Sequence, residues 1–393
     1  MLQLVTLDKI RVFVATEHTA DQRKTLAAVR SLARGGATVT VGSDGGICQP
    51  ALSRYCRRRV TYPSPVDNVE HFVTFLTKFL SHERHDVLLP LSDYTTLALA
   101  SHRESFLRVT RFPIADQPGL TVAYDKLETL MAAERLGMVI PHTDCPADEA
   151  EVEQISASIQ YPCVFKLRSG AGGVGLHFPR DAGELMAAYR AERPRDALFL
   201  AKQPLIQEHI SGPVHDVCAL FNRGRVRAAM TQQRIAMYPA AGGVGICVHT
   251  TDQPELLDQA VNLLESLEWH GPAMVEFRLD KRDGLFKLME INARYWGTLD
   301  VAIQAGIDFP TLACRMALDG DVAPTFNYAK GMEYRWLMHC DWRHALESNH
   351  RWRTAWRWYR PVRGRKSELW CSDPVPHLAE VFLAVRRACR GAR

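Results

Sequence analysis

The chain has 393 residues, of which 47% are hydrophobic and 23% charged, and its formal net charge is +4. This length allows two or three domains with hydrophobic cores, and the ordinary composition excludes a disordered or fibrous chain. No stretch approaches the roughly 18 uncharged apolar residues of a membrane-spanning helix. The first residues lack the pattern of a signal peptide. The ten scattered cysteines form no CxxC pair, which indicates reduced thiols and a cytoplasmic protein.

The N-terminal part of the sequence alternates strand and helix patterns. Residues 9–44 predict a strand, a helix and a second strand, followed by a helix near 67–82 and a strand at 86–93. This alternation is typical of an α/β domain with a mostly parallel sheet. The first turn, EHTADQRK, contains no glycine, which argues against a phosphate site there.

The pattern changes after Pro113, and strands dominate from residue 213 onward. The expected elements are a helix at 123–136, a strand at 161–167, a helix at 181–192, a strand ending at 207–210, hairpins that turn at Asn222-Arg223-Gly224 and around Asp283-Gly284, and helices near 254–267 and 298–318. This mixture predicts an α+β region after the α/β domain.

Polar residues alternate along a predicted strand in KLMEINARYWG, residues 287–297. Glu290, Asn292 and Arg294 stand at every second position, which places all three on one face of a strand. The preceding strand, AMVEFRLD, alternates in the same way and carries Glu276 on its polar face.

Pairing these two strands sets Glu276 opposite Glu290, and Phe277 opposite Met289 on the matching apolar face. Two carboxylates placed directly opposite are destabilising, and a bound cation would relieve the repulsion. Two carboxylates and the amide oxygen of Asn292 are hard ligands that suit Mg²⁺. The alternative is a solvated strand face whose charges point into water.

A glycine-rich loop follows the strand that ends at Lys166. Its glycines would let backbone amides approach an anion closely, and Lys166 adds positive charge; they are Gly170, Gly172, Gly173 and Gly175. The loop matches G-x-G-x-x-G, but the extended sequence LHFPR follows it where a dinucleotide fingerprint requires a helix. The alternative for this loop is a flexible hairpin tip.

Taken in order, these elements resemble the ATP-grasp superfamily of carboxylate–amine ligases, which includes D-alanine–D-alanine ligase, biotin carboxylase and the carbamoyl phosphate synthetase large chain. The likeness covers roughly residues 1–320, and MEINAR is close to the Glu-x-Asn-x-Arg signature of the family. It implies an α/β pre-ATP-grasp domain at 1–112, lobe A at 113–205 and lobe B at 206–325. Residues 326–393 would form a basic, Trp/Arg-rich extension.

The resemblance also implies roles for individual residues. Lys126 and Lys166 would contact the ATP phosphates, and the loop with Ser169, Gly170, Gly172, Gly173 and Gly175 would close over them. Gln207, Glu208, His209 and Ile210 would form the adenine hinge, and Glu276, Glu290 and Asn292 would hold Mg²⁺ or Mn²⁺. The family often has a ribose-binding glutamate where this chain has Val214, so Asp216 is the candidate for that role.

The implied activity is an ATP-dependent ligase that activates a small-molecule carboxylate as an acyl phosphate and joins it to an amine, with an amino acid or peptide-like substrate. Arg294 would stabilise the transferring phosphoryl group. Arg234, in the segment 231–245, would bind a substrate carboxylate or the γ-phosphate, unless it is an ordinary surface arginine. His209 and His215 fit no common zinc spacing.

Two other activities stay open. One is a bicarbonate-activating enzyme resembling biotin carboxylase, although the chain has no Met-Lys-Met carrier motif. The other is a non-catalytic ATP-binding module.

The tail of the sequence is strongly basic. Residues 331–393 hold 13 Lys/Arg against 6 Asp/Glu, and 351–366 contain seven basic residues, three tryptophans and no acidic residue. We expect 351–366 to form an amphipathic helix docked on the body; the alternatives are contact with an anionic membrane surface or an acidic carrier protein. No nucleic-acid motif is present, and a homodimer is compatible with the sequence.

Overall fold

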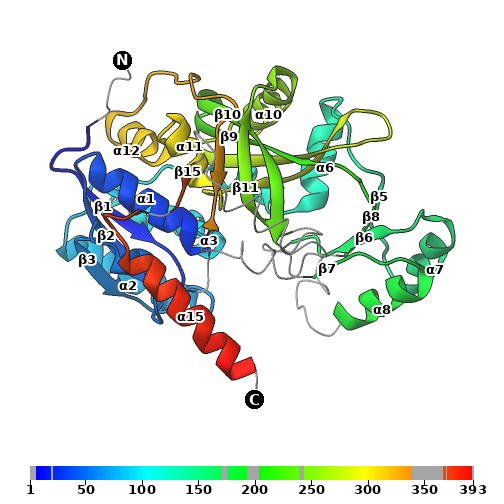
Figure 1. Cartoon of the computed structure of the whole chain (residues 1–393), viewed down its shortest axis with the longest axis horizontal. Coiled ribbons are helices and arrows are strands. Elements are labelled where there is room, and N and C mark those ends of the chain that lie inside the picture. Colours follow the sequence, from blue (N-terminus) through cyan, green and yellow to red (C-terminus); the bar gives the residue numbers. More distant parts are fainter. Residues whose placement is uncertain are drawn as a thin grey trace.

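The computed structural model describes residues 6–18, 21–169, 175–192, 203–238, 243–337, 366–368 and 370–391, and three sheets organise them. A parallel sheet from the N-terminal part and a small sheet from the middle of the chain lie on either side of a large central sheet (Figure 1). The expected parallel domain followed by an α+β region is confirmed. None of the helices in these residues is long and apolar enough to cross a membrane.

The first sheet has the order β3-β2-β1-β4, and every neighbouring pair in it is parallel. Its strands are β1 (Arg11–Ala15), β2 (Thr38–Ser43), β3 (Arg58–Thr61) and β4 (Val87–Pro90), and it is accompanied by α1 (Gln22–Arg34), η1 (Gln49–Leu52), α2 (Val69–His82), α3 (Asp93–Ser101) and α4 (Arg103–Leu107). Strands β1, β2 and β4 are almost entirely buried because helices cover both sides of a parallel sheet, whereas the edge strand β3 is mostly exposed. Ser92 begins α3 with a capping box, which fixes the position of Asp93 at its first turn.

The small sheet has the order β5-β8-β6-β7 and a core of its own. Its elements are β5 (Thr143–Asp144), α7 (Glu149–Ser158), β6 (Cys163–Lys166), β7 (Leu176–His177), α8 (Ala182–Glu192) and β8 (Leu205–Glu208). Val152 of α7 and Leu185 of α8 pack against Phe165, and all three side chains are fully buried. We call this unit lobe A.

The large sheet has the order β13-β12-β9-β10-β11-β14-β15. It contains β9 (Val214–Asn222), β10 (Arg225–Tyr238), β11 (Val244–Thr251), β12 (Gly271–Leu279), β13 (Phe286–Asn292), β14 (Glu333–Arg335) and β15 (Lys366–Ser367), with helices α5 (Gln117–Ala123), α6 (Lys126–Arg135), α10 (Pro254–Ser266), α11 (Leu299–Ala305) and α12 (Phe309–Asp319). The hairpin turn predicted between β9 and β10 is present, and its residues Arg223 and Gly224 both have positive φ, as a type I′ turn requires.

One predicted helix is two helices in the structure. The sequence indicated a single helix near 298–318, but α11 ends where Gly306 adopts φ 113°, a left-handed conformation that glycine tolerates. Asp308 then caps α12, and Pro310 occupies its first turn. The chain therefore changes direction between the two helices.

Two hydrophobic clusters run without a break from the first sheet into the large sheet. Val12 and Leu32 share a cluster with Cys218 and Trp296, and Phe72 belongs to a second cluster on the opposite face. Helices α5 and α6 also pack into the second cluster. The parallel domain and the large sheet therefore form one packed body, to which lobe A is attached.

The end of the chain is built into this body. Strands β14 and β15 extend the large sheet. Helix α15 (Val375–Gly391) follows Asp373, whose carboxylate accepts a 2.9 Å hydrogen bond from Arg30 of α1. Both side chains of this ion pair are about 1% exposed. The Arg/Trp-rich segment 351–365 lies outside the described residues.

We predict that Asp373→Ala lowers the free energy of unfolding by about 3–5 kcal/mol, because it leaves the buried Arg30 guanidinium without its partner. The matched control is Asp252→Ala, which removes a half-exposed partner of Lys330 and should leave stability almost unchanged. Urea unfolding followed by circular dichroism measures both. Equal losses in the two variants would contradict the assignment.

Candidate functional site

The predicted pairing of the two acidic strands is correct at its centre. Glu276 of β12 lies directly opposite Glu290 of β13. A bulge then shifts the register, so that Phe277 pairs with Leu288, and the predicted partner Met289 is wrong. The extra residue lets the apolar face of β12 stay buried while the two carboxylates remain adjacent.

Arg294 does not share the strand face with Glu290 and Asn292 as expected. Strand β13 ends at Asn292, and Arg294 follows it in an irregular segment. Its Nε donates a 2.8 Å hydrogen bond to Oδ2 of Asp93, in the first turn of α3. The arginine therefore joins the end of β13 to the N-terminal sheet.

Arg234 of β10 lies between two acidic side chains of neighbouring strands. Its Nη2 donates to Oδ1 of Asp216 at 2.7 Å and also to Oε2 of Glu276. Burial opposes the guanidinium charge, but the two carboxylates raise the pKa of Arg234 above its usual value. Burial and the nearby Glu290 raise the pKa of Glu276, which Arg234 counteracts.

Asp216 is fully buried beneath Arg234 and also accepts a 2.9 Å hydrogen bond from Gln232. It has no exposed oxygen to offer to a ribose, so the role expected for it gains no support from this geometry.

Lys166 lies at the end of β6, close enough to Glu276 and Glu290 to interact with them electrostatically. Its side chain is largely buried and donates a 3.0 Å hydrogen bond to Oε1 of Gln207. Burial and the charge of Lys126 lower the pKa of Lys166 to about 8, while Glu290 and Glu276 oppose the shift. The structure therefore brings two lysines and two carboxylates from separate elements close enough to interact through their charges.

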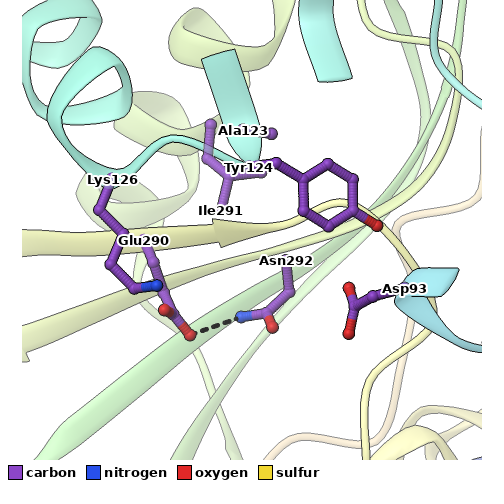
Figure 2. A pocket seen from close by; sticks show the side chains of 7 residues that line it. All are labelled: Asp93, Ala123, Tyr124, Lys126, Glu290, Ile291 and Asn292. Atoms are coloured by element: carbon purple, nitrogen blue, oxygen red, sulfur yellow. Dashed lines mark hydrogen bonds between the residues drawn. The ribbon is translucent and has the colours of Figure 1, made fainter. Parts of the chain in front are cut away.

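A pocket opens at this point of the molecule (Figure 2). It is lined by Asp93, Ala123, Tyr124, Lys126, Glu290, Ile291 and Asn292. The side chains of Lys126 and Glu290 point toward each other at one end, and Asp93 lies at the other. The Asn292 amide lies between them and donates a 3.1 Å hydrogen bond to Glu290.

The N-terminal sheet supplies site residues that the sequence analysis missed. Despite its burial, the charges of Arg294 and Lys24 hold the pKa of Asp93 below its usual value. Lys24 of α1 is 4% exposed, and burial together with Arg294 lowers its pKa to about 7.

The strand order of the N-terminal sheet could have predicted that Asp93 lies at a binding site. It follows the carboxyl end of β4, and β4 and β2 flank β1 on opposite sides. Such a switch point is where open parallel sheets commonly bind ligands.

The side chains of the expected hinge are already engaged. Gln207 accepts from Lys166 and donates to Thr143, and Glu208 accepts a 2.6 Å hydrogen bond from Arg282. A hinge contact would therefore use the backbone. Ile210 is buried, and burial followed by two nearby arginines lowers the pKa of His209.

Only the ends of the glycine-rich loop are described, at Ser169 and Gly175; Gly170, Gly172 and Gly173 lie outside the described residues. Gly175 has φ 66°, and a Cβ there would lie 2.5 Å from the Leu167 side chain. This glycine is therefore required by backbone conformation and by close packing.

Within the described part of the chain, no group of three or more His, Cys, Asp or Glu side chains gathers as a metal site. The candidate set has a different composition, since it consists of Glu276, Glu290 and the amide of Asn292. His209 and His215 belong to no such group either.

Comparisons with known proteins agree with this architecture. A family model described as "ATP-grasp in the biosynthetic pathway with Ter operon" matches residues 201–340. Pyruvate carboxylase of Staphylococcus aureus is 25% identical over 184 residues, which are 43% of this chain and 15% of that protein. The chain therefore spans a small part of the length of this curated relative.

Two solved structures share the fold. Biotin carboxylase from Campylobacter jejuni superposes with a TM-score of 0.67 at 14% identity, covering 82% of this chain and 74% of that one. An L-amino acid ligase from Bacillus licheniformis gives a TM-score of 0.59 at 18% identity, covering 80% and 75%. Residues 201–340 therefore match an ATP-grasp family, and the chain shares the fold of these two solved structures.

Proposed function

We propose that the chain is an ATP-dependent ligase that activates a carboxylate as an acyl phosphate and joins it to the amine of an amino acid or peptide-like substrate. The observation that carries the proposal is a pocket lined by Lys126, Glu290 and Asp93. Lys166 lies close enough to interact with Lys126 and Glu290 through charge, and Glu276 pairs with Glu290. A relative of similar fold is an L-amino acid ligase. This supports a reaction between amino-acid-like substrates.

Lys126 and Lys166 would bind the phosphates of ATP, with the backbone from Ser169 to Gly175 beside them. Glu276, Glu290 and Asn292 would hold Mg²⁺, and the residues present fit this ion. Two carboxylates in direct register create a local excess of negative charge, and their oxygens with an amide oxygen are ligands that Mg²⁺ accepts. The bound ion would neutralise phosphate charge during transfer.

The reaction has two steps that this site can support. A carboxylate oxygen of the first substrate attacks the γ-phosphorus, the bond to the β-phosphate oxygen breaks, and ADP leaves. The amine nitrogen of the second substrate then attacks the acyl carbon, inorganic phosphate leaves, and the nitrogen loses a proton. Arg294 would stabilise the negative charge of both steps, held in place by its hydrogen bond to Asp93.

Arg234 would act through Glu276 in this scheme. Its guanidinium is shared between Asp216 and Glu276, so it orients the carboxylate that faces Glu290. The sequence analysis proposed that Arg234 contacts a substrate carboxylate or the γ-phosphate directly. Its side chain is 11% exposed, so only a small part of it is accessible for such a contact.

The first experiment measures phosphate release from Mg-ATP over a grid of carboxylates, bicarbonate and amines. We expect release only with one carboxylate and one amine together, and a loss of about 10²-fold or more in Glu290→Gln. Glu255→Gln, an exposed glutamate of α10, is the matched control and should retain full activity.

Other outcomes of the grid are informative. Release with bicarbonate alone would favour the bicarbonate-activating alternative. Bound Mg-ATP without release under any condition would favour a non-catalytic module.

Asp93→Asn should lower kcat by about 10²-fold and leave the affinity for Mg-ATP unchanged, because it loosens the ion pair that positions Arg294. Steady-state kinetics with the substrate pair from the grid and calorimetry with Mg-ATP measure the two quantities. Glu104→Gln, an exposed glutamate of α4, controls for charge. A variant with normal kcat and weakened nucleotide binding would contradict this role.

Nucleotide binding should take up a proton near pH 8. The pKa of Lys166 is lowered to about 8, so the lysine is partly neutral there, and phosphate groups favour its charged form. The affinity for Mg-ADP should therefore fall as the pH rises above about 8. Calorimetry in buffers of different ionisation enthalpy measures the uptake.

Two substitutions separate charge from size at this position. Lys166→Arg keeps its charge at every accessible pH and should bind Mg-ADP without this pH dependence. Lys166→Met should bind weakly at all pH values. Unchanged proton uptake in both variants would show that another group titrates.

A further inference from the structure

Lys24, in the first turn of α1, is a buried lysine with no hydrogen-bond or ion-pair partner among the described residues. Its side chain is almost completely covered, with 4% exposed. The Nζ atom is not one of the described polar atoms that are sealed from solvent without a partner, so the small exposed part of the side chain includes the amine. A buried polar group is normally paired, and this one is left open to a ligand.

The place of Lys24 in the helix is also unfavourable for a positive charge. It follows Gln22 and Arg23 at the start of α1, and the first turn contains no acidic residue. The N–H groups at a helix N-terminus favour negative charge, and glutamate is common at this position. The charge of Arg23 is compensated by Asp21, which accepts a 2.8 Å hydrogen bond from it. A broken local rule without a compensating contact is typical of a functional position.

Four charged groups from separate segments act on the Lys24 amine, namely Arg294, Asp93, Asp21 and Glu17. Burial and then Arg294 lower the pKa of Lys24 to about 7, while the three carboxylates oppose the shift. A large fraction of this lysine is therefore neutral at neutral pH, whereas an ordinary lysine is fully charged there.

Arg294 and Asp93 relate Lys24 to one end of the pocket. Asp93 lines the pocket at the end opposite Lys126 and Glu290 (Figure 2). Of the four charged groups, Arg294 and Asp93 have the strongest effect on Lys24. Helices α1 and α3 and the segment after β13 share the hydrophobic clusters of the packed body. A shift of lobe A would therefore not separate Lys24 from Arg294.

The charges at this end favour a cationic ligand. When Lys24 is neutral, three carboxylates and one guanidinium group act at its position, and this excess of negative charge suits an ammonium group. The carboxylates are poor acceptors for its proton, because Asp93 and Asp21 are held by arginines and Glu17 accepts a 2.6 Å hydrogen bond from Ser92. A neutral lysine is a stronger base than a carboxylate.

We propose that Lys24 takes the first proton from the amine of the second substrate at the Asp93 end of the pocket, a role that rests on the proposed ligase function. The ammonium nitrogen gives one proton to Nζ of Lys24, and its freed electron pair attacks the acyl carbon beside Arg294. The bond from this carbon to the phosphate oxygen breaks, and the departing phosphate takes the second proton of the nitrogen. Lys24 then returns its proton to the solvent.

Hydroxylamine separates this step from the activation of the carboxylate. It is uncharged at neutral pH, so it attacks an acyl phosphate without a base and yields a hydroxamate. With Mg-ATP and the carboxylate found in the grid, the wild type and Lys24→Met should form hydroxamate at similar rates. With the amine substrate, Lys24→Met should lose at least about 10²-fold in kcat. Lys78→Met, an exposed lysine of α2, is the matched control and should retain both reactions.

Two further measurements distinguish proton transfer from binding through charge. Lys24→Arg keeps a positive charge but accepts no proton, so it should fail in the amine reaction as Lys24→Met does. The wild-type kcat should rise as the pH passes about 7, because only the neutral lysine accepts a proton, and Lys24→Met should lack this inflection.

Three results would overturn the proposal: full amine-dependent activity in Lys24→Met, equal loss of hydroxamate and amide formation in that variant, or full activity in Lys24→Arg. Equal loss of both products would show that Lys24 supports only the structure or the charge of Arg294. Circular dichroism melting detects unfolding of the variants. A wild type that forms no hydroxamate with any carboxylate would contradict the ligase function itself, and this role with it.

Discussion

The guanidinium of Arg234, held between Asp216 and Glu276, is the interaction on which the site depends. Three adjacent strands bring carboxylates together in a largely buried region, and such an arrangement is unstable without compensating positive charge. Arg234 supplies part of that charge from within the sheet. Lys166 from lobe A adds to it across the site, and Arg294 is in turn balanced by Asp93. The residues of the site are therefore coupled through charge even where they do not touch.

The three sheets are joined in two different ways. The N-terminal and large sheets share two continuous hydrophobic clusters, so their relative position is set by packing. Lobe A has its own core and is tied to the body by polar contacts, among them Glu208 with Arg282. A unit with its own core can shift as a rigid body, whereas a shared core resists such movement. Lys166, carried by lobe A, would change its distance to Glu290 in any such shift.

The sequence analysis predicted features that local patterns determine, and it missed contacts between residues that lie far apart in the sequence. Alternation along two strands and a glycine turn were enough to place Glu276 opposite Glu290. The bulge beside Phe277 could not be foreseen, because one inserted residue changes no sequence period. Asp93 was missed because its partner Arg294 lies 201 positions away in the sequence. By contrast, Gly306, Asp308 and Pro310 already carried the signal for the break between α11 and α12.

The buried pair of Arg30 and Asp373 joins residues 343 positions apart and so bears on how the protein is made. Arg30 leaves the ribosome long before Asp373, so its guanidinium has no carboxylate partner until 343 further residues have been synthesised. The packing of α1 in the N-terminal domain is thus completed only after Asp373 has been made.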